Sequence, residues 1–343
     1  MPAADTAPTA AGETPLVVVD RLTTGFDVGG RFVPAVDDLT FEIARGETLG
    51  LVGESGSGKS LTALSILRLV EPPGRIAGGR VLFGGRDLLA LPEHEIRRVR
   101  GAQIALIFQE PMTALNPVFT IGDQIAETLV VHGLASWSEA RRRAVDLLAD
   151  VRLPDPEQRA RDFPHQLSGG MRQRALIATA LACRPALVIA DEPTTALDVT
   201  IQGQILDLLR ELKGRYGLSL LLITHDLGVI AQTADRVAVM YAGRLVEQGP
   251  VRQVFARPAH PYTQGLLASM PGTAAGGRLK AIDGVVPTPE AIQPGCAFAP
   301  RCPHRFAPCT ADVPALSPVG DRHAARCFLL EPALARAPGD TTR

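Results

Sequence analysis

The eight residues GESGSGKS, Gly53–Ser60, decide the fold of this chain. They follow the apolar run LGLV, Leu49–Val52, and precede LTALSILRLV, residues 61–70, whose pattern predicts a helix. A GxxxxGK[ST] sequence between a strand and a helix forms a loop whose backbone N–H groups wrap phosphates. In such a loop Lys59 would neutralise the β- and γ-phosphates of a nucleotide, and Ser60 would offer its hydroxyl to Mg²⁺.

The composition is that of a packed soluble chain with no nucleic-acid partner. The 343 residues leave room for one large domain and a smaller one, and 46% are hydrophobic against 21% charged. The net charge of −1 gives no basic stripe for nucleic acid. No apolar run is long enough for a membrane span, and residues 1–14 lack the regions of a signal peptide. We therefore expect a disordered tail at 1–14 and a cytosolic chain that reaches a membrane only through a partner.

The apolar runs predict an α/β core. LVVV at 16–19 and LTFEI at 39–43 read as strands, as does LGLV, with Val28-Gly29-Gly30 as a turn. The continuous runs LVIAD and LSLLLIT, at 187–191 and 218–224, are typical of strands buried on both faces of a parallel sheet. Two helices are expected between and around them. The first begins near Ser138, and the second has one apolar face made of Ile201, Ile205, Leu208, Leu209 and Leu212.

A pair of carboxylates directly follows one of these strands. Asp191 and Glu192 come after LVIA, where a phosphate loop needs an acidic partner. Asp191 would hold Mg²⁺ through water, and Glu192 would polarise the water that attacks the nucleotide.

A second anion-binding feature lies in QLSGGMRQRALIATALA, residues 166–182. Ser168, Gly169 and Gly170 open a predicted helix whose first N–H groups are unpaired and carry partial positive charge. One domain rarely needs two such cradles for one nucleotide. The simplest explanation is a head-to-tail dimer in which each signature turn covers the nucleotide held by the other chain's phosphate loop.

The succession LSGGM, ADEPTTALD and LLITHD resembles the ATP-binding cassette (ABC) ATPase family, over about residues 15–271. The resemblance implies a P-loop NTPase fold of the ABC type, with a β-rich subdomain, a RecA-like core and a helical signature subdomain. It implies that Gln109 contacts Mg²⁺ and reports to a membrane partner, that Asp198 is the D-loop aspartate, and that His225 contacts the γ-phosphate. Phe26 would stack on adenine, with Phe32 as a competitor. The implied ATP contacts of the loop are Gly53, Glu54, Ser55, Gly56, Ser57, Gly58, Lys59, Ser60 and Leu61.

Finer features are similar to the ATPase subunits of bacterial oligopeptide/dipeptide importers. They are FQEPMTALNPVFTIGDQI at 108–125, HPYTQGLL at 260–267 and a cysteine-bearing tail. The resemblance implies ATP hydrolysis that powers peptide uptake, with two permease subunits, a second ATPase that is a paralogue, and an external substrate-binding protein. Importers of nickel, glutathione or another small solute share these features. A cassette ATPase that acts without a permease, as a redox or metal sensor, is the alternative from another class.

The region 272–330 is expected to form a small loop-rich domain, followed by a disordered tail at 331–343. It holds four of the five cysteines, Cys296, Cys302, Cys309 and Cys327. The reducing cytosol argues against disulfides, and the absence of close C-x₂₋₄-C pairs argues against zinc. Zinc, an iron–sulfur cluster and free structural thiols remain open on the residues alone. The resemblance favours a [4Fe–4S] cluster, because importers with this tail include members that carry one.

Overall fold

The computed structural model describes residues 14–195, 197–270 and 282–331. The expected tails and the domain boundary near Pro271 therefore lie outside the described residues, except for their inner edges. Strands and helices alternate through the first two ranges, as the apolar runs predicted.

The centre of the molecule is an eight-stranded sheet whose order is β11-β12-β10-β9-β3-β8-β7-β6. The five strands from β9 to β6 pair in parallel, and β10, β12 and β11 continue the sheet in antiparallel fashion. In chain order the strands are β3 (Thr48–Val52), β6 (Ile104–Ile107), β7 (Leu187–Asp191), β8 (Ser219–Thr224), β9 (Arg236–Tyr241), β10 (Arg244–Pro250), β11 (Ser317–Gly320) and β12 (His323–Ala325).

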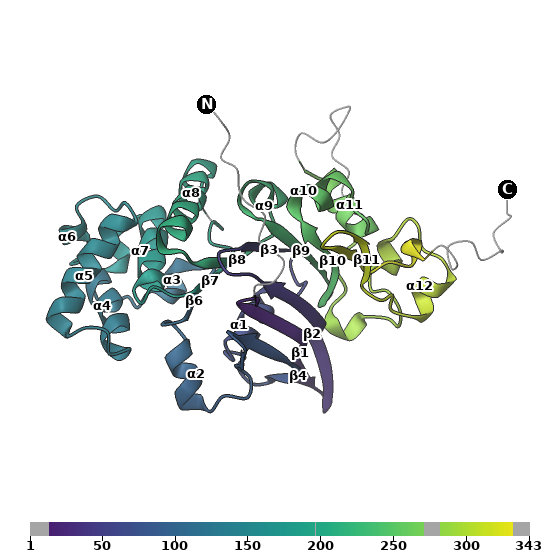
Figure 1. Cartoon of the computed structure of the whole chain (residues 1–343), viewed down its shortest axis with the longest axis horizontal. Helices are drawn as coiled ribbons and strands as arrows, with labels where there is room; N and C mark the ends of the chain where they lie inside the picture. Colours follow the sequence, from purple (N-terminus) through teal and green to yellow (C-terminus); the bar gives the residue numbers. More distant parts are fainter. Residues whose placement is uncertain (1–13, 196, 271–281, 332–343) are drawn as a thin grey trace.

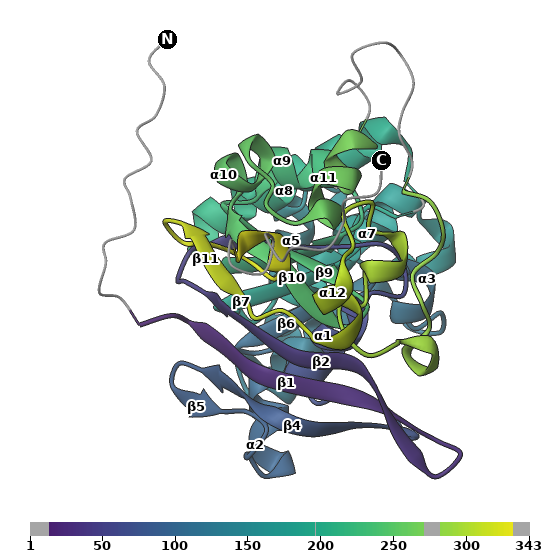
Figure 2. The ribbon, with the colours of Figure 1, turned by 90° about the vertical axis from the view of Figure 1, so that its right-hand side faces the viewer.

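A second, antiparallel sheet packs beneath the first (Figure 2). Its order is β2-β1-β4-β5, and the turn at Gly29 and Gly30 joins its two longest strands with φ of 57° and 79°. Its strands are β1 (Val17–Val28), β2 (Arg31–Ile43), β4 (Gly74–Phe83) and β5 (Arg86–Asp87). This is the expected β-rich subdomain.

Both faces of the central sheet are buried, which explains the continuous apolar runs. Along β7, Leu187 and Ile189 enter the core shared with the antiparallel sheet, whereas Val188 and Ala190 enter the core on the opposite face. Successive side chains of a strand point to opposite faces, so a strand covered on both sides is apolar at consecutive positions along its middle.

Helices α4 to α7 form a separate group at one end of the molecule, and the C-terminal region lies at the other end (Figure 1). This helical group is the expected signature subdomain. The helices of the chain are α1 (Lys59–Ile66), α2 (Glu93–Val99), α3 (Pro111–Ala114), α4 (Ile121–Val131), α5 (Trp137–Asp150), α6 (Pro156–Arg159), α7 (Gly169–Leu181), α8 (Val199–Tyr216), α9 (Leu227–Thr233), α10 (Val251–Ala256), α11 (Pro261–Ala268) and α12 (Ala307–Ala311).

One predicted helix start was wrong by two residues. The cap of α5 is Ser136, whose hydroxyl accepts from the backbone N–H of Glu139, and Ser138 lies inside the helix. The predicted apolar face of α8 is confirmed: Ile205, Leu208 and Leu212 are buried and Ile201 packs against the same core.

The C-terminal region is built from short elements only. Within 282–331 these are α12, β11, β12 and three 3₁₀ turns, Pro289–Ala291, Ala299–Arg301 and Phe328–Leu330. The region is joined to the central sheet, because β12 pairs with β10 through Glu247 and Ala325. A buried hydrogen-bond contact between His323 Nε2 and Glu247 Oε1, at 2.7 Å, joins the same two strands.

Candidate nucleotide site

The loop Gly53–Ser60 joins the carboxyl end of β3 to the first turn of α1. Gly58 is the N-cap of α1 and has φ of 100°, a conformation that residues with a Cβ avoid. A Cβ at Gly58 would also lie 2.7 Å from the carbonyl oxygen of Ala35. The loop therefore needs glycine here both for its turn and for its close approach to the β-rich subdomain.

Lys59 lies across the inside of this loop. Its Nζ donates to the carbonyl oxygens of Gly53 and Glu54, at 2.8 and 3.0 Å, and to Ser57 Oγ at 3.4 Å. The side chain is buried, and burial lowers the pKa of the ammonium while Glu192 and Asp191 oppose that shift. The loop thus holds a cation at its centre through its own carbonyl oxygens.

Asp191 lies beside the loop at the end of β7. Burial raises the pKa of its carboxyl, and a hydrogen bond from Ser60 acts in the opposite direction. Its Oδ1 is buried without a hydrogen-bond partner among the described residues. A buried carboxylate oxygen with a free lone pair, next to a serine hydroxyl, is the oxygen donor set that Mg²⁺ prefers, so these residues fit the ion.

Glu192 is the meeting point of three side chains from different segments. Its carboxylate accepts from Thr195 Oγ1 at 2.8 Å and from Gln109 Nε2 at 3.2 Å, and it contacts His225 Nδ1 at 3.2 Å. Burial would raise the pKa of Glu192, but the hydrogen bonds of Thr195 and His225 outweigh it and hold the pKa below its ordinary value. The carboxylate therefore stays ionised and can accept a proton.

Gln109, Glu192 and His225 face the start of the loop, residues 53–55, across one cleft with a volume of about 690 Å³. The structure thus brings together the predicted loop, Gln109, Glu192 and His225, although they come from four separate parts of the chain. The lining residues are Val52, Gly53, Glu54, Ser55, Gln109, Glu192, His225, Leu227, Leu266, Gly284, Val285 and Val286.

The signature turn lies away from this cleft, at the start of α7. Ser168 is the N-cap, with its Oγ 3.4 Å from the backbone N–H of Met171, and both Ser168 and Gly169 are exposed. Asp198 caps α8 in the same way, accepting from the backbone N–H of Ile201 at 2.9 Å, and is also exposed.

The two aromatic candidates for adenine lie on the hairpin of β1 and β2. Phe26 is partly exposed and pairs with Val33 across the hairpin. The ring of Phe32 is covered by the guanidinium of Arg75, 4.4 Å from the ring centroid. Neither residue lines the cleft around Glu192.

The four cysteines of the C-terminal region line one small pocket together with His260 and His304. Burial raises the pKa of Cys296, Cys302 and Cys327, that of Cys327 to about 11. All four thiols are free. Within 14–195, 197–270 and 282–331, no three Cys, His, Asp or Glu side chains are arranged to hold a metal ion, so nothing here supports the expected [4Fe–4S] cluster.

Three residues at this site were not identified from the sequence. Thr195 was quoted only as part of a motif, although it lies three residues after Glu192, within reach of its carboxylate. Tyr262 belongs to HPYTQGLL, and its hydroxyl accepts from the backbone N–H of Glu54 at 2.9 Å. Arg301 holds the Glu54 carboxylate and carries no sequence signal that distinguishes it from the other arginines.

Two family models match the chain. Residues 36–195 match the ABC transporter model, and residues 246–309 match the model of the oligopeptide/dipeptide transporter C-terminal region. Among solved structures, a dimeric bacterial ABC transporter cassette is 29% identical with a TM-score of 0.62, over 69% of this chain and 99% of that one. CbiO1 of Clostridium perfringens is 26% identical with a TM-score of 0.61, over 71% and 92% of the two chains.

Curated relatives match nearly end to end. Oligopeptide transport ATP-binding protein AppD of Bacillus subtilis is 50% identical over 318 residues, which cover 92% of this chain and 97% of AppD. A protein of Sinorhizobium fredii, named a probable peptide ABC transporter ATP-binding protein, is 54% identical over 316 residues, 91% and 94% of the two chains. The chain therefore belongs to the ATP-binding proteins of ABC transporters, in the group that carries the oligopeptide/dipeptide transporter C-terminal region.

Proposed function

We propose that this chain hydrolyses ATP to power the uptake of di- or oligopeptides through a membrane permease. The observation that carries the proposal is the cleft in which Gln109, Glu192 and His225 face the phosphate loop, in a chain whose relatives are named for peptide transport. Peptide is preferred over nickel or glutathione because the names of these relatives refer to peptides.

Hydrolysis in this cleft follows from the positions of its side chains. The loop's N–H groups and Lys59 bind the β- and γ-phosphates, and Glu192 accepts the proton of the water that attacks the γ-phosphorus as the bond to ADP breaks. His225, which contacts the same carboxylate and lines the same cleft, would contact the γ-phosphate. Ser60, Asp191 and Gln109 would hold Mg²⁺, directly or through water. When bound, this ion neutralises charge on the β- and γ-phosphates.

The remaining nucleotide contacts are proposed to come from two further places. Phe26 would stack on adenine from the β-rich subdomain. Ser168, Gly169 and Gly170, with the D-loop Asp198, would contact a nucleotide held by another ATPase chain. The exposure of Ser168, Gly169 and Asp198, and the lack of an acidic residue in the first turn of α7, support that role. We propose a paralogous chain as the partner, since importers of this group often use two different ATPases.

The permease would dock beside the helical subdomain, which would place the chain on the cytoplasmic face of the membrane. In the described residues, no helix combines the length and the apolar character needed to cross a bilayer. The segment 108–119, which contains Gln109, exposes four large apolar side chains that suit such a contact, Phe108, Met112, Val118 and Phe119.

For the C-terminal region we propose a unit from about 272 to 330 that follows the ATPase domain at 15–271. Its cysteines would bind a [4Fe–4S] cluster, with zinc as the other candidate. Importers with this tail include members that carry a cluster, and in this chain the four cysteines line one pocket. Iron, sulfide and zinc analysis of anaerobically purified protein tests this, and one equivalent of zinc without iron would overturn the cluster.

Copurification tests the proposed function. The tagged chain, extracted from its own cells in mild detergent, should bring down two multispanning permease subunits and a second ATPase. ATP hydrolysis by this complex should rise when peptide-loaded binding protein is added. An isolated chain without membrane partners, whose ATPase activity depends on a bound cluster, would instead support the sensor alternative.

A further inference from the structure

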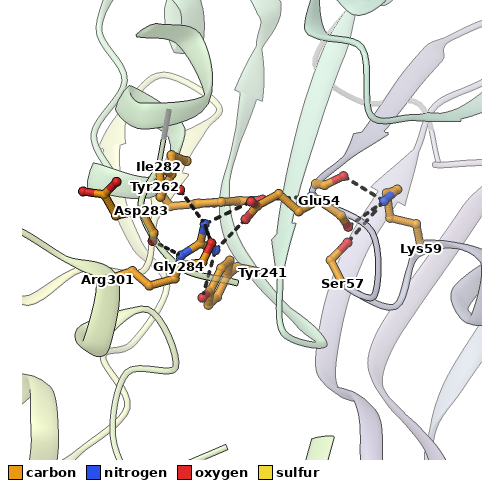
Figure 3. A network of polar contacts seen from close by, with 10 residues as sticks. Glu54, Ser57, Lys59, Tyr241, Tyr262, Ile282, Asp283, Gly284 and Arg301 are labelled. Atoms are coloured by element: carbon orange, nitrogen blue, oxygen red, sulfur yellow. Dashed lines mark hydrogen bonds and ion pairs between the residues drawn. The ribbon is translucent and has the colours of Figure 1, made fainter. Parts of the chain in front are cut away.

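Arg301 of the C-terminal region reaches the phosphate loop and forms a bidentate ion pair with it. Its Nη1 and Nη2 lie 2.7 and 3.0 Å from the two carboxylate oxygens of Glu54, the second residue of the loop (Figure 3). The Arg301 side chain is only 6% exposed. Paired guanidinium–carboxylate contacts of this kind fix geometry as well as charge.

Glu54 is held at three points, and Arg301 is the one that comes from the C-terminal region. Its backbone N–H donates to the hydroxyl of Tyr262 at 2.9 Å, and its carbonyl oxygen accepts from Lys59 Nζ at 3.0 Å. The carboxylate of Glu54 forms the ion pair with Arg301. Glu54, whose carbonyl oxygen helps to hold Lys59 in place, is therefore itself held by side chains from outside the loop.

Arg301 also fixes a wall of the cleft. Its Nε donates to the carbonyl oxygen of Asp283 at 2.8 Å, and Nη2 donates to those of Ile282 and Gly284, both at 3.2 Å (Figure 3). Gly284, Val285 and Val286 line the cleft that contains Gln109, Glu192 and His225. One side chain thus joins the loop to the segment that faces it.

We propose that Arg301 is a positioning residue for the nucleotide: it holds Glu54 and the segment 282–284 so that the phosphate loop stays in its binding conformation. The inference rests on the proposed ATPase function. Because Arg301 directly precedes Cys302, the cysteine-bearing segment and the loop are joined through one side chain.

The first test replaces the guanidinium by an apolar chain of similar length. Arg301→Met should weaken Mg·ATP binding about tenfold, since the pair's loss leaves the loop free to adopt other conformations. The turnover number at saturating ATP should change less than threefold, because Gln109, Glu192 and His225 are untouched. Arg301→Lys keeps the positive charge but cannot form the paired guanidinium contact with Glu54, so it should recover only part of the affinity for ATP.

A double-mutant cycle separates this role from general destabilisation. If Arg301 acts through Glu54, Arg301→Met combined with Glu54→Gln should bind ATP no more weakly than the weaker single variant. Arg326 is a matched control, since it also fastens the C-terminal region, with Nε donating to the carbonyl oxygen of Leu245 at 3.0 Å and Nη1 to that of Pro314 at 3.2 Å. Arg326→Met should leave ATP affinity unchanged.

Affinities are measured by calorimetric titration of Mg·ATP in a Glu192→Gln background that stops turnover, and KM and kcat in the unmodified background. Wild-type affinity in Arg301→Met, additive losses in the double variant, or an equal loss in Arg326→Met would each overturn the inference. If the parent chain binds no ATP, it is the proposed function that fails; if it binds ATP and Arg301→Met binds equally well, only this inference fails.

Discussion

The helices α1 and α7 both begin at a glycine-bearing turn, yet their surroundings are opposite. The start of α1 is closed: Lys59 spans the loop, Tyr262 and Arg301 hold Glu54, and these contacts are buried or part-buried. The start of α7 is open, with Ser168 exposed. Neither helix has an acidic residue in its first turn, whereas α4 has Asp123 and α5 has Glu139.

This contrast bears on the proposal that one chain carries two anion sites. A helix start without a carboxylate of its own keeps its positive end available to a ligand. At α1 the surrounding residues hold the loop that precedes the helix in one conformation without a nucleotide. At α7 the described residues supply the cap alone, so the opposing surface would come from another molecule. On the proposed function, the loop at α1 would bind its nucleotide without residues of another chain, whereas the start of α7 would bind one only in an assembly.

The largest expected effect lies on the closed side. Glu192→Gln should lower ATP hydrolysis by a factor of about 10²–10⁴ while ATP binding is retained, because the amide accepts the contacts of Thr195 but cannot take a proton. The rate of hydrolysis is measured from the phosphate released, and ATP binding is measured by titration with Mg·ATP. Normal hydrolysis in this variant would show that Glu192 is not the base.

The next effect separates binding from chemistry. Lys59→Ala should weaken ATP binding about 10- to 100-fold, because a charged hydrogen bond to phosphate is worth about 1.5–3 kcal/mol. Lys213→Ala is the control, since that lysine pairs with Asp235 at 3.1 Å, away from the loop. Equal losses in the two variants would contradict the special role of Lys59.

The sequence predicted those parts of the site that follow local patterns. The phosphate loop, the strand ends at Asp191 and Glu192, and the helix start at Ser168 each combine a motif with a strand or helix period. The choice of Ser138 over Ser136 was avoidable, since Ser136 has glutamate at the third helical position, the pattern of a capping box.

Contacts between distant segments left no such pattern. Arg301 and Glu54 are 247 residues apart, and an arginine that forms an ion pair looks like any other arginine in the sequence. The pairing of β12 with β10 was also missed, because β12 has three residues and shows no strand period. What joins the C-terminal region to the core is tertiary and becomes visible only in the fold.

The pH dependence of stability tests whether His260, beside the Tyr262 that holds Glu54, is buried in its neutral form. His260 caps α11, its Nδ1 accepting from the backbone N–H of Tyr262 at 3.0 Å, and burial lowers its pKa to about 3 from an ordinary 6.5. Below pH 6.5 the unfolded chain takes up a proton that the folded chain excludes. The free energy of unfolding should therefore fall as the pH is lowered, by about 1.4 kcal/mol between pH 7.5 and pH 5.5.

His260→Asn keeps a capping oxygen without a group that titrates in this range. The urea midpoint of the parent chain should fall between pH 7.5 and 5.5, and that of the variant should fall less, by the equivalent of that free energy. Equal shifts in the two chains would show that His260 is protonated in the fold.

The smallest effect decides whether the open side binds anything. Ser168→Ala and Ser136→Ala each remove an exposed helix cap of the same geometry, so each should lower the free energy of unfolding by about 1 kcal/mol. If the start of α7 covers a nucleotide, only Ser168→Ala should also slow ATP hydrolysis in the assembled transporter. The two variants are compared at equal folded concentration, with urea unfolding and phosphate release as the measurements. Equal ATPase rates would make Ser168 a cap and nothing more, and the second anion site would lose its best-placed contact.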